Sequence, residues 1–327
     1  MGESNKNIGF VAIGRNEGER LKRCLLSIAQ VTDRVVYVDS NSSDGSVTFA
    51  RERNVEVVEL DMSIPFTAAR ARDAGFERLK EKWPDTDFVH FIDGDCEVVE
   101  GWPEKALAEI MRDDNLGVVT GWRSERFPDA TVYNMMCEVE WRGPAGDIAA
   151  CGGDMLVRVA AYEEAGGFNP IVIAAEDDEF CIRVRKAGYA IRRLTEEMTL
   201  HDAAMTRFSE WWARARRAGH GYAQVGAMHP DYFRQERRRV ILWGAVIPAL
   251  AIIALLIRPW LIIPFIALYG LSYLKSRRGL IAGGVSPENA SAYGRFLVLS
   301  KAPNFLGMMT YWRRRLLNDD YKIIEYK

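Results

Sequence analysis

Short apolar runs alternate with segments of helical periodicity through the first hundred residues. Four of these runs have the length of buried strands: 8–13, 35–38, 55–60 and 88–92. Between them, segments 19–29 and 68–80 repeat apolar residues at the spacing of one helix face. Strands that alternate with helices are typical of right-handed βαβ units. We therefore expect an α/β fold with a Rossmann-like, mostly parallel sheet flanked by helices.

Polar clusters follow three of the four predicted strands. They occupy residues 15–17 (Arg-Asn-Glu), 39–44 and 93–95 (Asp-Gly-Asp). In open α/β sheets, ligands bind at the carboxyl ends of the strands. The three clusters therefore predict one shared binding site.

The last third of the chain has a different pattern. Residues 240–257 carry no charge, and a helix of this length spans about 27 Å, close to the thickness of a bilayer core. A second uncharged run covers 260–274, and basic residues flank the pair at both outer ends. This favours a hairpin that enters the membrane from the cytosolic side, with Arg258-Pro259 at its tip. Whether the tip crosses the bilayer stays open because the second arm is short, and a buried pair of core helices is the alternative.

The distribution of charge and the cysteine content indicate where in the cell the protein lies. Net charge is -2, yet residues 207–239 hold eight Arg, no Lys and three acids. Because this basic stretch adjoins the apolar arms, a membrane surface explains it better than nucleic acid does. The five cysteines form no C-x-x-C pair, which favours reduced thiols in the cytosol. Residues 1–6 lack the apolar run of a signal peptide, so we expect the first half to stay in the cytosol.

The motif Asp93-Gly94-Asp95 places two carboxylates directly after a buried strand. Alternate residues at a strand end can aim both side chains into one pocket, where hard oxygen ligands suit Mg²⁺ or Mn²⁺. A cation held there can neutralise a diphosphate leaving group. An ordinary turn is the alternative interpretation.

Two further pairs are candidates for binding the rest of a ligand. Asp39 and Asp44 flank a turn, and their carboxylates could accept bonds from a base or a ribose, although Asp44 is also explained as a helix cap. Arg70 and Arg72 share one predicted helix, and an arginine fork suits a diphosphate. They point in different directions, so we expect one to face the site and favour Arg70; a solvated face is the alternative.

Two later groups are candidates for catalysis and metal binding. Glu176-Asp177 precedes a predicted helix at 180–187, and a carboxylate there could act as general base or simply favour the helix N-terminus. His201 could complete a metal site with Asp95, although a lone histidine is more often a packing residue.

Together these segments resemble glycosyltransferase family 2, with its GT-A fold, over residues 8 to about 220. The resemblance rests on the order of motifs at 11–17, 36–46, 69–75, 93–95, 166–168 and 176–177. It implies that Asp39 contacts the donor base, Arg70 the base or phosphate, and Asp93 the ribose or metal. Asp95 would bind Mn²⁺ or Mg²⁺ with His201, Glu17 would belong to the donor site, and Asp177 would deprotonate the acceptor hydroxyl with inversion. Two departures stand out: Asp73 replaces the usual Asn, and Glu176 or Asp178 could serve in place of Asp177.

The resemblance also implies an organisation and a location. Residues 1–100 would bind the nucleotide sugar, of UDP or GDP type, 101–235 the acceptor, and 236–327 would form a membrane hairpin with interfacial helices, one of them at 296–317. We expect a bacterial polysaccharide-type enzyme of the inner membrane that faces the cytoplasm, contacts membrane lipids, does not bind nucleic acid and does not export polymer. Its acceptor would be a lipid-linked or polysaccharide hydroxyl, and the tail 323–327 resembles endings of exopolysaccharide enzymes. A sugar nucleotidyltransferase, for which 14–18 is a poor glycine-rich loop, and an inactive membrane scaffold are the competing functions.

Overall fold

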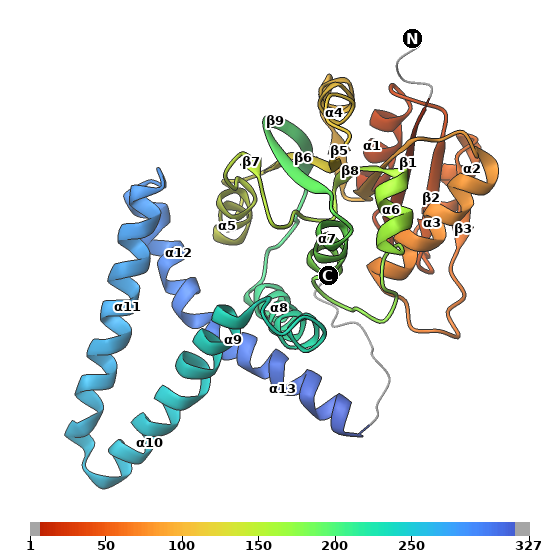
Figure 1. Ribbon diagram of the computed structural model, residues 1–327. Coiled ribbons are helices and arrows are strands. Elements are labelled where there is room, and N and C mark those ends of the chain that lie inside the picture. The colour runs from red at the N-terminus through yellow and green to blue at the C-terminus, as the bar shows by residue number, and fades with distance from the viewer. Residues whose placement is uncertain (1–6, 318–327) are drawn as a thin grey trace. The chain divides into compact units, whose positions relative to one another are not determined.

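The computed structural model describes residues 7–317 (Figure 1). The signal-peptide argument at 1–6 and the resemblance of the tail at 323–327 lie outside the described residues. The chain divides into two compact units, Met1–Phe127 with Glu140–Ala203, and Pro128–Val139 with Ala204–Lys327. Helix α5 (Val132–Trp141) runs across the boundary between them.

The first half of the first unit follows the predicted alternation. Strands β3 (Glu56–Glu59), β2 (Val35–Asp39), β1 (Ile8–Gly14) and β4 (Phe88–Asp93) are parallel neighbours in that order. Helices α1 (Glu19–Ile28), α2 (Ser46–Glu52) and α3 (Ala68–Lys82) connect them. Strand β1 is buried on both faces, as a central strand of a parallel sheet is: Ile8 and Phe10 enter one core layer and Val11 and Ile13 the other. The alternation read from the sequence is confirmed here.

The expectation of a mostly parallel sheet is wrong for the second half. The whole sheet has nine strands in the order β3-β2-β1-β4-β8-β6-β9-β5, with β7 beside β9. The added strands are β5 (Cys96–Val98), β6 (Leu116–Glu125), β7 (Gly146–Asp147), β8 (Met155–Arg158) and β9 (Ala190–His201). Pairs β4–β8, β6–β8, β5–β9 and β7–β9 are antiparallel, whereas β6–β9 is parallel. Long-range pairings set these directions, and the local hydrophobic pattern does not encode them.

Three helices pack around this second half. They are α4 (Trp102–Ile110), α6 (Val159–Ala165) and α7 (Glu176–Lys186). Inside the core, His90 accepts a hydrogen bond from Trp102 Nε1 at 2.9 Å and stacks on Phe10. Burial lowers the pKa of His90 to about 4, so the imidazole is neutral and belongs to the core.

The second unit is helical. Its helices after residue 203 are α8 (Phe208–Met228), α9 (Arg234–Ile241), α10 (Ile247–Ile257), α11 (Ile263–Ala282), α12 (Pro287–Leu299) and α13 (Lys301–Leu317). The π-helical turn η2 (Leu242–Val246) joins α9 to α10, and the 3₁₀ turn η3 (Pro259–Ile262) joins α10 to α11. Helices α8 and α13 cross at Gly219 and Gly307, where an added Cβ would strike the backbone of the other helix. The expected single interfacial helix at 296–317 is instead divided between α12 and α13. Pro303 lies in the first turn of α13, a position that proline favours because no backbone N–H is needed there.

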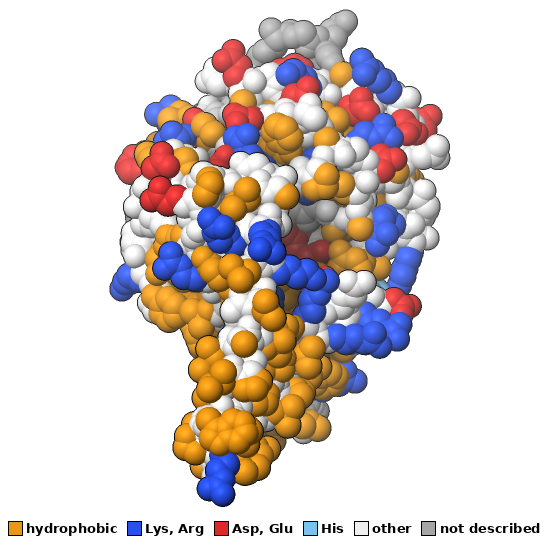
Figure 2. Space-filling view, turned by 90° about the vertical axis from the view of Figure 1, so that its left-hand side faces the viewer, with side chains coloured by type: hydrophobic (Ala, Val, Ile, Leu, Met, Phe, Trp, Pro, Cys, Tyr) orange, Lys and Arg blue, Asp and Glu red, His pale blue; other side chains and the backbone are white. Residues whose placement is uncertain are grey.

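The apolar arms form an exposed part of this second unit. Among the described residues, one helix, Arg234–Ile257, is long and apolar enough to cross a membrane, and only 11% of its most apolar window is buried. Figure 2 shows hydrophobic side chains gathered over the arm that α10 and α11 form. The arms contact near their base, where Tyr269 Oη donates to the Trp243 carbonyl at 2.6 Å. That exposure does not fit the alternative of a buried core pair.

Candidate active site

The loops after β1 and β2 are held together by side chains of the first two polar clusters. Asn16, at φ 55°, accepts a bond from Ser43 N on its side chain, and its own N–H donates to Ser42 Oγ, both at 2.8 Å. Asp44 accepts from Gly18 N at 2.8 Å and from Ser46 N at 3.1 Å. Asp44 therefore fixes the loop and the turn that leads into α2, whereas the N-cap residue of that helix is Gly45.

The structure brings the three polar clusters to one edge of the sheet. Gly14 lies opposite Asp39 in the β1–β2 register, and Ile13 lies opposite Asp93 in the β1–β4 register. Asp39 is buried, and its carboxylate accepts from Tyr37 Oη and Ser42 N, each at 2.8 Å. Glu17 pairs with Arg20 at 2.7 Å, next to the ends of β1 and β4.

Arg72, rather than Arg70, contacts the carboxylates of the site. Its guanidinium donates to Asp93 Oδ1 and to Glu176 Oε1, both at 2.7 Å, from a fully buried position. Arg70 donates instead to the carbonyls of Asp61 and Ile64, at 2.7 and 2.8 Å. The expected role of Arg70 at the donor stays a prediction, but in these contacts it is Arg72 that reaches the carboxylates of the site. The sequence held a signal for Arg72, because it falls between Ala69 and Phe76 on the apolar face of α3.

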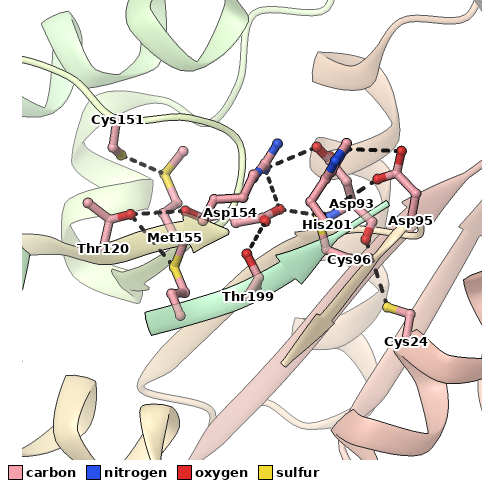
Figure 3. Close-up of polar contacts among 12 residues, drawn as sticks. Cys24, Asp93, Asp95, Cys96, Thr120, Cys151, Asp154, Met155, Thr199 and His201 are labelled. Carbon is pink, nitrogen blue, oxygen red and sulfur yellow. Dashed lines mark hydrogen bonds and ion pairs between the residues drawn. The ribbon is translucent and has the colours of Figure 1, made fainter. Parts of the chain in front are cut away.

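A second arginine, Arg123, with a side chain that is 14% exposed, adds to the surroundings of Asp93. Figure 3 shows Asp93 together with Asp95, Asp154 and His201. Arg123 Nη2 lies 3.3 Å from Asp93 Oδ2 and 2.8 Å from Asp154 Oδ1. Asp154 also accepts from Asp93 N at 2.9 Å and from Thr199 Oγ1 at 2.8 Å. Burial acts against a charged Asp93, but Arg72 and Arg123 outweigh it and hold the pKa of this carboxyl below its ordinary value. Asp154 was not among the predicted site residues. The one feature of the sequence that could have indicated it is its place between Gly152-Gly153 and an apolar strand.

Asp95 and His201 lie together, as the proposed metal pair requires. His201 Nε2 lies 3.3 Å from Asp95 Oδ2, and Cys96 supplies a sulfur to the same cluster, whose donor atoms are all within 4.8 Å of one another. On the other side of the ring, His201 Nδ1 lies 3.5 Å from Glu125 Oε2. Burial opposes protonation of His201, but the carboxylates of Asp95 and Glu125 outweigh it and raise the imidazole pKa. This donor set fits a divalent cation, since a carboxylate and an imidazole can both ligate one.

Asp177 lies in the first turn of α7, beside the partners of Arg72. Ala175 precedes this helix in a left-handed conformation (φ 58°), a strain of about 1–3 kcal/mol that the surrounding structure must hold. Glu176 is buried against Arg72, whereas Asp177 is partly exposed and accepts from Asp178 N at 2.9 Å. Burial, then the charges of Glu176 and Asp178, raise the pKa of Asp177 well above its ordinary value, although Arg72 opposes them. A partly exposed carboxylate with a raised pKa is suited to take a proton near neutral pH.

Residues 11–151 match the sequence model of the family described as Glycosyl transferase family 2. The chain carries a glycosyltransferase family 2 domain. Curated relatives of this glycosyltransferase include Glycosyltransferase AglE of Haloferax volcanii, 25% identical over 64% of this chain and 71% of that protein. Another is the pre-mycofactocin glycosyltransferase of Mycobacterium tuberculosis, 24% identical over 70% of this chain. The match spans only half (50%) of the length of that second relative.

Two solved structures share the α/β, GT-A-like fold with this one. Mannosyltransferase PcManGT from Pyrobaculum calidifontis, in complex with GDP-Man and Mn²⁺, matches with a TM-score of 0.57 at 16% identity, over 94% of this chain and 87% of that one. S. aureus TarS 1–349 in complex with UDP matches with a TM-score of 0.51 at 14% identity, over 94% and 91% of the two chains.

Proposed function

We propose that this glycosyltransferase uses a divalent cation to transfer a sugar, with inversion, from a nucleotide diphosphate to a hydroxyl of a lipid-linked or glycan acceptor. The observation that carries this proposal is the continuous set of contacts at one sheet edge. Arg72 joins Asp93, two residues before the metal pair member Asp95, to Glu176, the neighbour of the partly exposed Asp177. A cation-binding group and a candidate base therefore flank one position where a donor sugar can lie.

In this proposal, different residues of the chain have different roles in the reaction. Asp39 binds the donor base, and Asp93, fixed by two arginines, positions the ribose. Asp95 and His201 would hold Mn²⁺ or Mg²⁺, which when bound supplies positive charge to the leaving diphosphate. Asp177 accepts the proton of the acceptor hydroxyl as its oxygen bonds to the anomeric carbon and the bond to the diphosphate breaks. Attack from the face opposite the leaving group inverts that carbon.

The similar structures support the class of donor. PcManGT was solved with GDP-Man and Mn²⁺ and TarS with UDP, so a UDP- or GDP-linked sugar suits the same fold. The family match at 11–151 favours transfer over the nucleotidyltransferase alternative.

Calorimetry of nucleotide binding tests this proposal. We expect the full chain in detergent to bind UDP or GDP with Mn²⁺ and to lose about tenfold or more in affinity with a chelator. Asp95→Asn should cause the same loss, because it removes a charged ligand. The fully exposed Asp114, changed to Asn, is the matched control and should bind as the wild type does. If folded protein binds neither nucleotide with metal, or if Asp95→Asn binds normally, the cation-dependent donor site is wrong.

We also propose that the α10–α11 arm enters the inner membrane from the cytoplasmic side, with the first unit facing the cytoplasm. Leu256 is 80% exposed and Ile253 53% exposed in an arm without charges between Val240 and Ile257. A charge at the centre of a membrane helix costs about 2.5–3.5 kcal/mol. This arm contacts lipid in the proposal, and whether its tip crosses the bilayer is left open.

Vesicle flotation measures this insertion. With phosphatidylcholine and phosphatidylglycerol in equal parts, we expect the wild type to float and the double variant Ile253→Asp, Leu256→Asp to remain largely in the soluble fraction. Met111→Asp changes a residue of the first unit that is 61% exposed, and it should float like the wild type. Equal flotation of the double variant and the wild type would rule out a role for the arm in lipid binding.

A further inference from the structure

The candidate cation cluster contains a soft ligand in addition to its oxygen and nitrogen atoms. Cys96 follows Asp95 at the start of β5 and lies opposite His201 in the β5–β9 register. Its Sγ is 3.8 Å from Asp95 Oδ1, and His201 Nε2 is 3.3 Å from Asp95 Oδ2. All three residues are buried, and their donor atoms lie within 4.8 Å of one another.

These separations agree with one coordination geometry. Zinc ligands lie about 2.3 Å (sulfur) and about 2.0–2.2 Å (nitrogen or oxygen) from the ion. In a tetrahedron, the two ligand atoms are then about 3.4 Å apart for nitrogen with oxygen and about 3.6 Å for sulfur with oxygen. The distance from His201 Nε2 to Asp95 Oδ2 is 3.3 Å, and the distance from Cys96 Sγ to Asp95 Oδ1 is 3.8 Å. Both are close to these edges but end on different oxygens of Asp95, so the carboxylate has to turn one oxygen toward both partners when a cation binds.

The surroundings of His201 fit the same geometry. Glu125 Oε2 lies 3.5 Å from His201 Nδ1, on the side of the ring away from Asp95. Glu125 is itself held by the backbone N–H groups of Phe127 and Ala203, at 3.2 and 3.1 Å. The negative charge of Glu125 favours a proton on His201 Nδ1, which leaves Nε2 to bind a metal, although Nδ1 makes no hydrogen bond to this carboxylate.

We infer that Cys96 is a third protein ligand of this site, and that the nucleotide-free protein binds a thiophilic divalent cation, Zn²⁺, through Asp95, Cys96 and His201. The inference relies on the proposed function only for the position of the cation. Binding of Zn²⁺ forms a Zn–S bond and releases the thiol proton to solvent, with no change of oxidation state. Mn²⁺ and Mg²⁺ prefer oxygen ligands and leave the thiol protonated. Zn²⁺ and Mn²⁺ therefore exclude each other, and Zn²⁺ acts as a competitor of the cation used for transfer.

Cobalt spectroscopy tests this ligand directly. Co²⁺ added to the full, nucleotide-free chain in detergent should give the near-ultraviolet band of a cobalt–thiolate bond, and Zn²⁺ should abolish that band. Cys96→Ser should lack the band and bind Zn²⁺ at least about tenfold more weakly. Cys24→Ser is the matched control, because Cys24 is also buried and its sulfur lies 3.8 Å from the Asp93 carbonyl. It should keep the band.

The outcomes separate this inference from the proposed function. If wild-type protein shows no thiolate band with Co²⁺, or if the band survives in both Cys96→Ser and Cys96→Ala, Cys96 is not a ligand. The wild-type spectrum decides this even if a variant does not fold. Nucleotide binding with Mn²⁺ is measured on the same sample. Intact nucleotide binding without the band overturns only the inference, whereas the band without nucleotide binding overturns only the donor site.

Discussion

Changing Asp177 to Asn should lower the turnover of sugar transfer by about 10²–10⁴-fold, the usual contribution of a general base. Asn cannot accept the proton of the acceptor hydroxyl, while Asp39, Asp93 and Asp95 remain to bind the donor. Nucleotide affinity should therefore stay close to that of the wild type. Because the pKa of Asp177 is raised, wild-type turnover should fall as the pH drops through that raised value, at a higher pH than an ordinary carboxyl would give.

The same substitution should stabilise the folded protein at neutral pH. A carboxyl whose pKa is higher in the folded state than in the unfolded state favours folding when protonated. Its contribution is fully present below the unfolded value of 3.8 and is lost as the pH rises through the folded value. Above its raised folded-state pKa, the ionised Asp177 therefore opposes folding by about 1.4 kcal/mol for each pKa unit of the shift. We expect a higher melting temperature for Asp177→Asn at neutral pH and no difference from the wild type in acid.

Variants of the neighbouring acids decide between the candidate bases. Asp178→Asn should keep turnover within about tenfold of the wild type, because Asp178 only adjoins the proposed base. Glu176→Gln should mainly weaken donor binding and stability through loss of its bond to Arg72. A larger loss of turnover in Asp178→Asn than in Asp177→Asn would transfer the role of base to Asp178.

Changing Arg72 to Gln should destabilise the protein by about 3–5 kcal/mol, because it leaves two carboxylates without their buried partner. Asp93 and Glu176 both bond to this guanidinium, and the Glu176 side chain is only 8% exposed. Nucleotide affinity should fall in any fraction that remains folded. Chemical denaturation and calorimetry measure the two effects.

Arg70→Gln is the matched control on the same helix. Its guanidinium bonds only to loop carbonyls among the contacts described, so we expect a change of about 1 kcal/mol or less. Arg72→Lys keeps the charge but cannot reach both carboxylates with a planar fork, and should lie between the two. Gly153→Ala should resemble Arg72→Gln, since its Cβ would collide with Arg72 Nη2. If Arg70→Gln lost more nucleotide affinity than Arg72→Gln, Arg70 would be the donor-binding residue after all.

Much of the first half of the fold could be predicted because its signals are local. Strands such as Ile8–Gly14 and Phe88–Asp93 are apolar over their whole length, and helix α1 repeats Leu21 and Leu25 on one face. Parallel order then brings the strand ends to one edge, and with them Asp39 and Asp93. The second half could not be predicted in the same way, because β8 and β9 take their directions from partners distant in the sequence.

In the candidate site, too, some residues follow from local sequence patterns and others only from contacts in the folded chain. The chain by itself determined the residues at the strand ends, Asp39, Asp93 and Asp95, and the carboxylate at the start of α7, since each follows from a local pattern. Only the tertiary structure decided that Arg72 contacts Asp93 and that Arg123 and Asp154 fix that carboxylate. It also decided that Glu125 lies behind His201. The physical reason is that a helix residue's direction and a strand's neighbours depend on packing across the sheet, which no window of sequence contains.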